Sequence, residues 1–208
     1  GLVQIELHFA KQGFLYFNLS RVNSQLITYA QFEHGLLDHL VDEPDDGRVL
    51  VLFLVVGILG GELAVDGGVE AFRADSSLDV LILTGAGDPS AGSRQAAFCA
   101  GADLKSTAGL MARPGAQESG PMGFSRITDL EKPAIAAVNG YCLAGGLELA
   151  CWCDFRIADE TAQFGVLNRR WGVPLLDGGT QRLPRIVGLG NALYLIESGV
   201  MIDAQHAL

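Results

Sequence analysis

The chain alternates short apolar runs with stretches in which apolar residues recur at helical spacing. Leu63, Val69 and Phe72 lie roughly on one side of a predicted helix over residues 62–75. The predicted strands cover residues 49–59, 79–84, 134–139, 154–159 and 163–166, with a hairpin that pairs 2–9 with 14–19. The other predicted helices cover residues 145–153, 179–188 and 190–198. This alternation of strands and helices predicts an α/β fold.

Segments rich in Gly, Ser, Pro and Ala separate these elements. Residues 86–96 and 107–123 have this composition and are predicted loops. We expect residues 127–130 to end a helix that leads into the strand at 134–139. The longest apolar run, residues 49–59, is shorter than the about 20 residues that span a bilayer, so it predicts a buried strand and no membrane helix.

Composition and charge narrow the class of protein. Of the 208 residues, 49% are hydrophobic and 18% are charged, which is typical of a globular domain and not of a disordered chain. A formal net charge of −10 argues against a nucleic-acid partner, because phosphates require a basic surface. A polyanionic coenzyme would for the same reason need a local basic patch.

The cysteines show no spaced disulfide framework. They are Cys99, Cys142, Cys151 and Cys153, all in apolar or motif contexts. The pair Cys151-x-Cys153 is too close in sequence, and too isolated, for a zinc site. We therefore expect buried thiols, no metal and a cytoplasmic, reducing location.

Two glycine-bearing turns indicate a site that could stabilise negative charge on a ligand. Residues 139–150 read NGYCLAGGLELA, a turn after an apolar strand and then a helix with one carboxylate, Glu148, in its first turn. Residues 98–104, FCAGADL, also follow a strand and end in small residues. Free backbone N–H groups at such turns favour negative charge on a ligand. If each turn gives one donor to a carbonyl oxygen, the two form an oxyanion hole beside Glu148, which predicts acyl chemistry.

Two nucleotide-binding patterns are incomplete. Gly85-Ala86-Gly87 begins like a dinucleotide fingerprint, but the third glycine is absent and Pro89 interrupts the turn. Gly140 and Gly145 have the spacing of a P-loop, yet Gly146-Leu147 stands where Lys and Ser or Thr are required. Neither pattern is favoured.

The chain resembles the enoyl-CoA hydratase/isomerase (crotonase) superfamily over roughly residues 69 to 208. The stretches that carry the resemblance are LTGAG at 83–87, AFCAGADLK at 97–105, KPAIAAVNGYCLAGGLELACWCDFRIADETAQFG at 132–165 and GGTQRLPRIVG at 178–188. The resemblance implies a single domain over residues 1–208, divergent in 1–68, folded as a spiral of ββα turns and assembled as homo-trimers or hexamers. The helices that normally end this fold are absent after Leu208, which indicates a truncated C-terminal helical part.

The same resemblance implies the roles of individual residues. The backbone N–H groups of Ala100 and Gly145 would form the oxyanion hole, and Glu148 would move protons. Asn168 occupies the position of the second glutamate of family hydratases, and an amide can orient water but cannot exchange its proton at neutral pH. Asp177 matches a catalytic aspartate of family dienoyl-CoA isomerases, and it fits equally an N-cap of the helix that follows.

Substrate contacts and cofactors follow from the resemblance as well. Ala102, Asp103, Leu104, Asn168 and Trp171 are expected to bind substrate, and Trp171 follows a basic pair that is equally consistent with an exposed surface. No metal or separate cofactor is implied, because coenzyme A is part of the acyl-CoA thioester substrate. Addition of water to a 2-enoyl-CoA is the leading activity. Double-bond isomerisation, and a non-catalytic acyl-CoA-binding relative or inactive fragment, remain alternatives.

Overall fold

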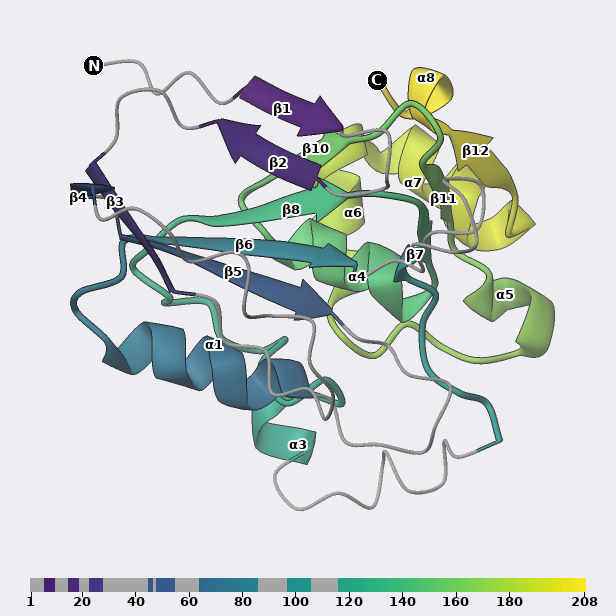
Figure 1. Cartoon of the computed structure of the whole chain (residues 1–208). Coiled ribbons are helices and arrows are strands. Elements are labelled where there is room, and N and C mark those ends of the chain that lie inside the picture. The colour runs from purple at the N-terminus through teal and green to yellow at the C-terminus, as the bar shows by residue number, and fades with distance from the viewer. Residues whose placement is uncertain are drawn as a thin grey trace.

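The computed structural model describes residues 6–9, 15–18, 23–27, 45–46, 48–54, 64–85, 97–105 and 116–208. The fold is mixed α/β, with strands through the middle of the molecule and helices around them (Figure 1). The strands are β1 (Glu6–Phe9), β2 (Leu15–Asn18), β3 (Asn23–Ile27), β4 (Asp45–Asp46), β5 (Arg48–Leu54), β6 (Val80–Gly85), β7 (Ala97–Cys99), β8 (Ala134–Val138), β9 (Tyr141–Leu143), β10 (Phe155–Ala158), β11 (Gln163–Gly165) and β12 (Met201–Asp203). The helices are α1 (Ala64–Ala74), α3 (Ala116–Ser119), α4 (Gly145–Trp152), α5 (Asn168–Trp171), α6 (Gly179–Val187), α7 (Leu189–Ser198) and α8 (Ala204–Ala207).

The largest sheet has the strand order β10-β8-β6-β5-β3-β4. Neighbouring strands in it are parallel except β3 and β4. All five side chains of β8 are buried, and β6 is buried after its first residue, as expected of apolar strands inside a parallel sheet. The one polar side chain of β6, Thr84, donates its hydroxyl proton to the carbonyl oxygen of Ala137 at 2.9 Å, which satisfies the buried hydroxyl.

A second sheet has the order β12-β11-β9-β7 and carries both glycine-bearing turns. Strand β9 is parallel to β7 and to β11, and β12 runs antiparallel to β11. Because β7 ends at Cys99 and β9 at Leu143, and Cys99 lies opposite Cys142, the two turns leave the same edge of the sheet. The predicted hairpin is confirmed separately by the antiparallel pairing of β1 with β2.

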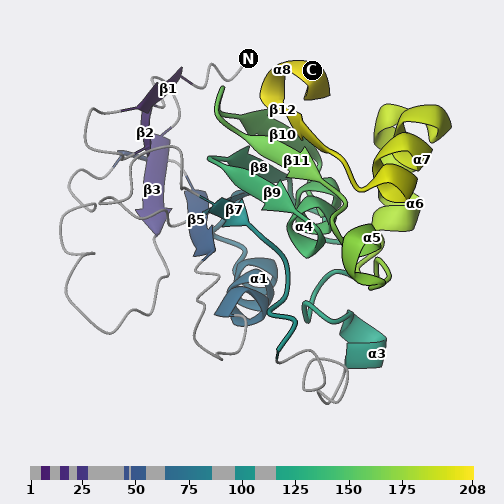
Figure 2. The ribbon, with the colours of Figure 1, turned by 90° about the vertical axis from the view of Figure 1, so that its right-hand side faces the viewer.

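The helices cover the sheets in two groups. Helix α1 packs against β5, whereas α4 packs against α6 and α6 against α7. In Figure 2, α5, α6 and α7 lie together on the side opposite β1, β2 and β3. The core between these layers is apolar, and its largest fully buried side chains include Phe72, Phe98, Phe124, Leu81, Leu83 and Leu149.

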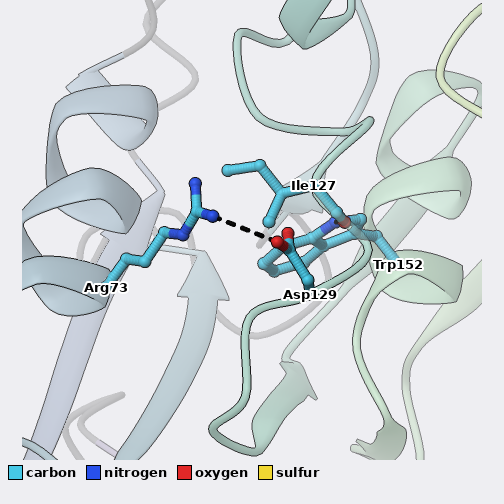
Figure 3. Close-up of polar contacts among 4 residues, drawn as sticks. All are labelled: Arg73, Ile127, Asp129 and Trp152. Carbon is cyan, nitrogen blue, oxygen red and sulfur yellow. Dashed lines mark hydrogen bonds and ion pairs between the residues drawn. The ribbon is translucent and has the colours of Figure 1, made fainter.

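Residues 127–130 connect the two groups of helices, as Figure 3 shows. Trp152, at the end of α4, donates its indole N–H to the carbonyl oxygen of Ile127 at 3.0 Å. Arg73 of α1 forms a 3.3 Å ion pair with Asp129, but both side chains are exposed, so this pair adds little stability. The link therefore depends on Trp152, whose ring also meets Phe124 edge-on at 5.0 Å between centroids.

The predicted helix ending at residues 127–130 is wrong. Those residues form no helix, and only the short α3 precedes them. Gly120 and Gly123 have φ of 90° and 85°, which a right-handed helix cannot contain, so the chain turns there. The other helices and strands predicted from the sequence are present, with ends that differ by a few residues where described. Residues 55–59 of the predicted strand, the loop 86–96 and residues 107–115 lie outside the described residues.

Candidate active site

The turn before α4 is held in an uncommon backbone conformation. Ala144 has φ 53° and ψ −121°, a region that residues with a side chain rarely adopt. Three hydrogen bonds hold it: its N–H donates to the carbonyl oxygen of Gly165 at 2.9 Å, and its own carbonyl accepts the N–H groups of Leu147 at 3.0 Å and Glu148 at 3.2 Å. Such strain persists only where the surroundings impose it, and here it sets the direction in which the peptide of Gly145 faces.

The start of α4 approaches β7 too closely for any side chain. A Cβ atom on Gly146 would lie 1.9 Å from the carbonyl oxygen of Cys99, so this position requires glycine. On the other side of the turn, a Cβ atom on Gly101 would lie 3.3 Å from the nitrogen of Gly145. The structure therefore places the turn at 100–101 directly against the turn at 144–145.

The backbone N–H groups of Ala100 and Gly145 have no acceptor among the residues that the structure describes. Gly145 is half-buried and Ala100 is exposed, so both groups can meet a ligand. This is the arrangement that an oxyanion hole needs, with one donor from each turn. Their role as that oxyanion hole stays a prediction.

Glu148 lies one turn into α4, with 3% of its surface exposed. Its Oε1 accepts the backbone N–H of Asp177 at 2.9 Å and that of Gly179 at 2.8 Å. Burial raises the pKa of Glu148 to about 7, since the loss of solvation outweighs these donors and the negative charge of Asp177 acts in the same direction. A carboxyl group with this pKa can both give and take a proton near neutral pH.

Asp177 is buried beside Glu148, and its side chain is turned toward residues 120–125. Its Oδ1 accepts the backbone N–H of Met122 at 3.1 Å and the hydroxyl of Ser125. The alternative role of Asp177 as an N-cap is wrong: Gly178 occupies the cap of α6, with no side-chain hydrogen bond there. Carboxylate acceptors bond the nearest suitable donors, and the turn at 120–125 supplies them.

Arg182 of α6 links the loop of Asp177 to the turn of Ser125. Its guanidinium donates to the carbonyl oxygen of Asp177 at 2.7 Å and to that of Ser125 at 2.6 Å. A planar fork of donors suits two acceptors at fixed spacing. The loop that carries Asp177 and the turn that carries Ser125 are thereby joined by main chain as well as by side chain.

Asn168 opens α5 and is only partly satisfied. Its Nδ2 donates to the carbonyl oxygen of Pro174 at 3.3 Å. Its Oδ1 is buried and has no donor among the described residues. A buried acceptor without a donor is rare in a folded protein, and a water or ligand hydroxyl is a usual partner.

The remaining predicted binding residues are open to solvent. Ala102, Asp103 and Leu104 follow β7 and are exposed, and Asp103 accepts the backbone N–H of Lys105 at 2.9 Å. Trp171, at the end of α5, is 69% exposed. The structure thus brings Ala100, Gly145, Glu148 and Asp177 together and leaves Trp171 on the surface.

Sequence reasoning missed Met122 and Ser125. Both fall in or beside a segment predicted only as a loop, and nothing in their spacing marks them. The signal available in the sequence was the pair Gly120 and Gly123, which marks a turn. In the structure Gly120 has φ 90°, and a Cβ atom there would be 2.0 Å from the Ser125 hydroxyl oxygen. A turn that tight brings its side chains to one point.

Metal and thiol chemistry gain no support at this site. In the described part of the chain, no group of three or more His, Cys, Asp or Glu residues could hold a metal ion. All four cysteines are free and buried, as predicted. Burial raises the pKa of Cys99 to about 11 and that of Cys142 well above its usual value, so these thiols stay protonated. Among the described helices, none is long and apolar enough to cross a membrane.

An open pocket lies away from these carboxylates. It has a volume of about 520 Å³ and is lined by residues that include Ile127, Leu130, Trp152 and Arg182, but neither Glu148 nor Asp177. Three of its charged groups, Lys132, Asp154 and Arg182, already have hydrogen-bond partners. We therefore place the candidate site at the turns and not in this pocket.

Comparison with known proteins identifies the family. The sequence model of the enoyl-CoA hydratase/isomerase family matches residues 67–208. The chain is 44% identical over 148 residues to the crotonyl-CoA hydratase of Syntrophomonas wolfei subsp. wolfei, covering 70% of this chain and 54% of that protein. It is 44% identical over 137 residues to the short-chain-enoyl-CoA hydratase of Clostridium acetobutylicum, covering 64% and 49%. The chain belongs to the enoyl-CoA hydratase/isomerase family.

Solved structures agree with this assignment. An enoyl-CoA hydratase from Mycobacterium marinum matches with a TM-score of 0.59 and 37% identity, over 70% of this chain and 54% of that one. One from Bacillus anthracis matches with a TM-score of 0.54 and 40% identity, over 68% and 53%. The predicted crotonase fold is confirmed. The chain spans about half the length of the relatives it matches.

Proposed function

We propose that this chain adds water across the double bond of a short-chain 2-enoyl-CoA thioester. The observation that carries the proposal is the pair of buried carboxyl residues, Glu148 and Asp177, with the backbone N–H of Asp177 donating to Oε1 of Glu148 at 2.9 Å. The backbone N–H groups of Ala100, after β7, and Gly145, at the start of the helix of Glu148, have no acceptor among the described residues. Hydration needs both parts, a holder for the thioester oxygen and groups that move two protons.

The proposed steps balance in atoms and charge. The oxygen of water bonds to Cβ of the substrate, and the electron pair of the double bond moves through Cα to the thioester oxygen. The N–H groups of Ala100 and Gly145 stabilise that enolate oxygen, a contribution of about 3 kcal/mol for each donor in comparable sites. Asp177 accepts the proton that water loses, and the protonated form of Glu148 gives a proton to Cα.

Asn168 has a supporting role in this proposal. Its Oδ1, buried without a donor among the described residues, would accept a hydrogen bond from the attacking water and orient it. Asp177 then supplies the base that the second glutamate supplies in other hydratases of the family. Ala102, Asp103, Leu104 and Trp171, all exposed, would contact the coenzyme A portion of the substrate.

We further propose that no metal or separate cofactor takes part, because coenzyme A arrives within the substrate. The printed names of relatives, crotonyl-CoA hydratase and short-chain-enoyl-CoA hydratase, support a short acyl group. Four buried free thiols support a reducing, cytoplasmic location. Exposed apolar side chains on α6 and α7, including Ile186, Leu189 and Tyr194, support assembly into a homo-trimer or hexamer.

The test is turnover of crotonyl-CoA, followed by loss of the conjugated thioester absorbance. Glu148→Ala should lower kcat/KM by about a hundredfold or more, since a general acid–base group contributes that much. Glu197→Ala, on the exposed surface of α7, is the matched control and should leave the rate unchanged. Folded wild-type protein that binds acyl-CoA thioesters but shows no turnover would contradict hydration.

One observation favours a second candidate, double-bond isomerisation. With an amide at position 168, Glu148 could move one proton between two carbon atoms of the substrate without any water addition. Incubation in D₂O separates the two activities. Deuterium at Cα together with a hydroxyl at Cβ supports hydration, and a shifted double bond without a hydroxyl supports isomerisation.

A further inference from the structure

Met122 contacts both halves of the candidate site. Its methyl carbon Cε lies 3.0 Å from the position that a Cβ atom on Gly145 would occupy, so its thioether end lies against the turn of the oxyanion segment. Its backbone N–H donates to Oδ1 of Asp177 at 3.1 Å. With 8% of its surface exposed, Met122 is buried between those two residues and belongs to the hydrophobic core.

The main chain that carries this side chain is itself held in a tight turn. A hydrogen bond of 2.8 Å from the N–H of Gly123 to the carbonyl oxygen of Gly120 closes a tight turn around Met122. Both glycines have positive φ, a conformation that would strain other residues. Since Asp177 also holds the Met122 N–H, the Cα–Cβ bond of Met122 keeps its direction unless the turn opens.

We propose that Met122 is a specificity-determining residue whose thioether end walls the acyl pocket beside Gly145 and restricts the substrate to short acyl groups. This inference rests on the proposed function. A thioester oxygen at the Gly145 N–H, with Cα and Cβ directed to Glu148 and Asp177, must pass along the Met122 side chain. An acyl chain that continues beyond Cβ then meets the buried thioether.

The experiment measures binding of saturated thioesters, which cannot be hydrated. Calorimetry gives the affinities of butanoyl-CoA and decanoyl-CoA for wild type, Met122→Leu, Met122→Ala and the control Met201→Ala. Met201 lies on β12 and is 40% exposed, so its side chain is open to solvent where that of Met122 is buried. The affinity for decanoyl-CoA relative to butanoyl-CoA should rise about tenfold or more in Met122→Ala, since even one methylene in an apolar pocket carries that much. Met122→Leu should show a smaller rise, and Met201→Ala none.

Thermal unfolding of each variant shows whether it is folded. Leucine nearly conserves the volume of methionine, so Met122→Leu should fold. Its side chain ends one atom short of the thioether methyl, so it decides the question if Met122→Ala does not fold. If a folded variant binds decanoyl-CoA and butanoyl-CoA with the same affinity ratio as wild type, Met122 does not limit the length of the acyl group.

Turnover of crotonyl-CoA by wild type separates this inference from the proposed function. Turnover by wild type with an unchanged affinity ratio in the Met122 variants contradicts the role of Met122 alone. A changed affinity ratio without turnover supports that role in a protein that binds acyl-CoA without hydrating it. Absence of all acyl-CoA binding by the wild type overturns both.

Discussion

The backbone N–H of Asp177 donates to the Oε1 of Glu148 at 2.9 Å, so the main chain of one carboxyl residue orients the side chain of the other. The side chain of Asp177 faces a different partner, the turn that holds Met122 and Ser125. The two carboxyl groups therefore lie in one site but are positioned by different segments. A change at residues 177–179 should therefore affect the Glu148 side chain first, and a change at residues 122–125 the Asp177 side chain.

Stability should depend on pH through Glu148. Its pKa of about 7 in the folded protein is above its ordinary 4.5, so the folded state holds this proton more tightly than the unfolded state does. Its contribution to stability is complete below pH 4.5 and is lost as pH rises through 7. Between pH 5 and pH 8 wild type should lose about 2 kcal/mol more free energy of unfolding than Glu148→Gln. Urea denaturation at both pH values measures this difference. Equal losses in the two proteins would contradict a buried Glu148 with a raised pKa.

Gly179→Ala should displace the Glu148 side chain while the backbone N–H of residue 179 remains. A Cβ atom there would lie 2.8 Å from Cγ and 3.0 Å from Oε1 of Glu148, closer than atoms in contact tolerate. Crotonyl-CoA turnover should fall about a hundredfold, because a small misplacement of a catalytic group costs that much.

Gly190→Ala is the matched control for that change. Gly190 lies in α7 with no atom within 4 Å of its would-be Cβ. The substitution should leave turnover unchanged and raise the free energy of unfolding by about 0.5–1 kcal/mol, since alanine is the better helix former. If both alanine variants keep full turnover, the position of Glu148 is not set by Gly179.

Asp177→Asn should remove the charge and keep the structure. The amide oxygen of asparagine can accept the same two hydrogen bonds, from the Met122 N–H and the Ser125 hydroxyl. We expect a melting temperature close to that of wild type and a kcat about a hundredfold lower, because the amide cannot take a proton from water. Hydration at the wild-type rate would remove Asp177 from the proposed mechanism and leave its role structural.

Ser125→Ala should lower stability through a buried hydrogen bond. The hydroxyl of Ser125 is buried against Oδ1 of Asp177, which would keep only the Met122 N–H as donor. Loss of a hydrogen bond to a charged group should cost about 1.5–3 kcal/mol of the free energy of unfolding. Ser198→Ala, where an exposed hydroxyl donates to the carbonyl oxygen of Tyr194, is the control and should change stability little. Similar small losses in both variants would refute the importance of the Ser125 contact.

Local sequence determined the elements and the two N–H turns of this protein. Apolar runs of strand length and the glycines at 101, 145 and 146 act within a few residues, so their consequences can be predicted from spacing alone. The carboxylate of Glu148 could likewise be placed in the first turn of its helix. The helix expected to end at 127–130 failed because the turn glycines before it took positive φ angles.

The tertiary structure alone decided what surrounds the two carboxyl groups. Oε1 of Glu148 is held by N–H groups 29 and 31 residues later, and Asp177 by donors 55 and 52 residues earlier. Burial, which raises the pKa of Glu148 to about 7, also depends on packing between α4 and α6. Contacts between distant segments arise when the apolar faces of sheets and helices close on one another. A linear pattern therefore names Glu148 and Asp177, and only the folded chain gives each its partners.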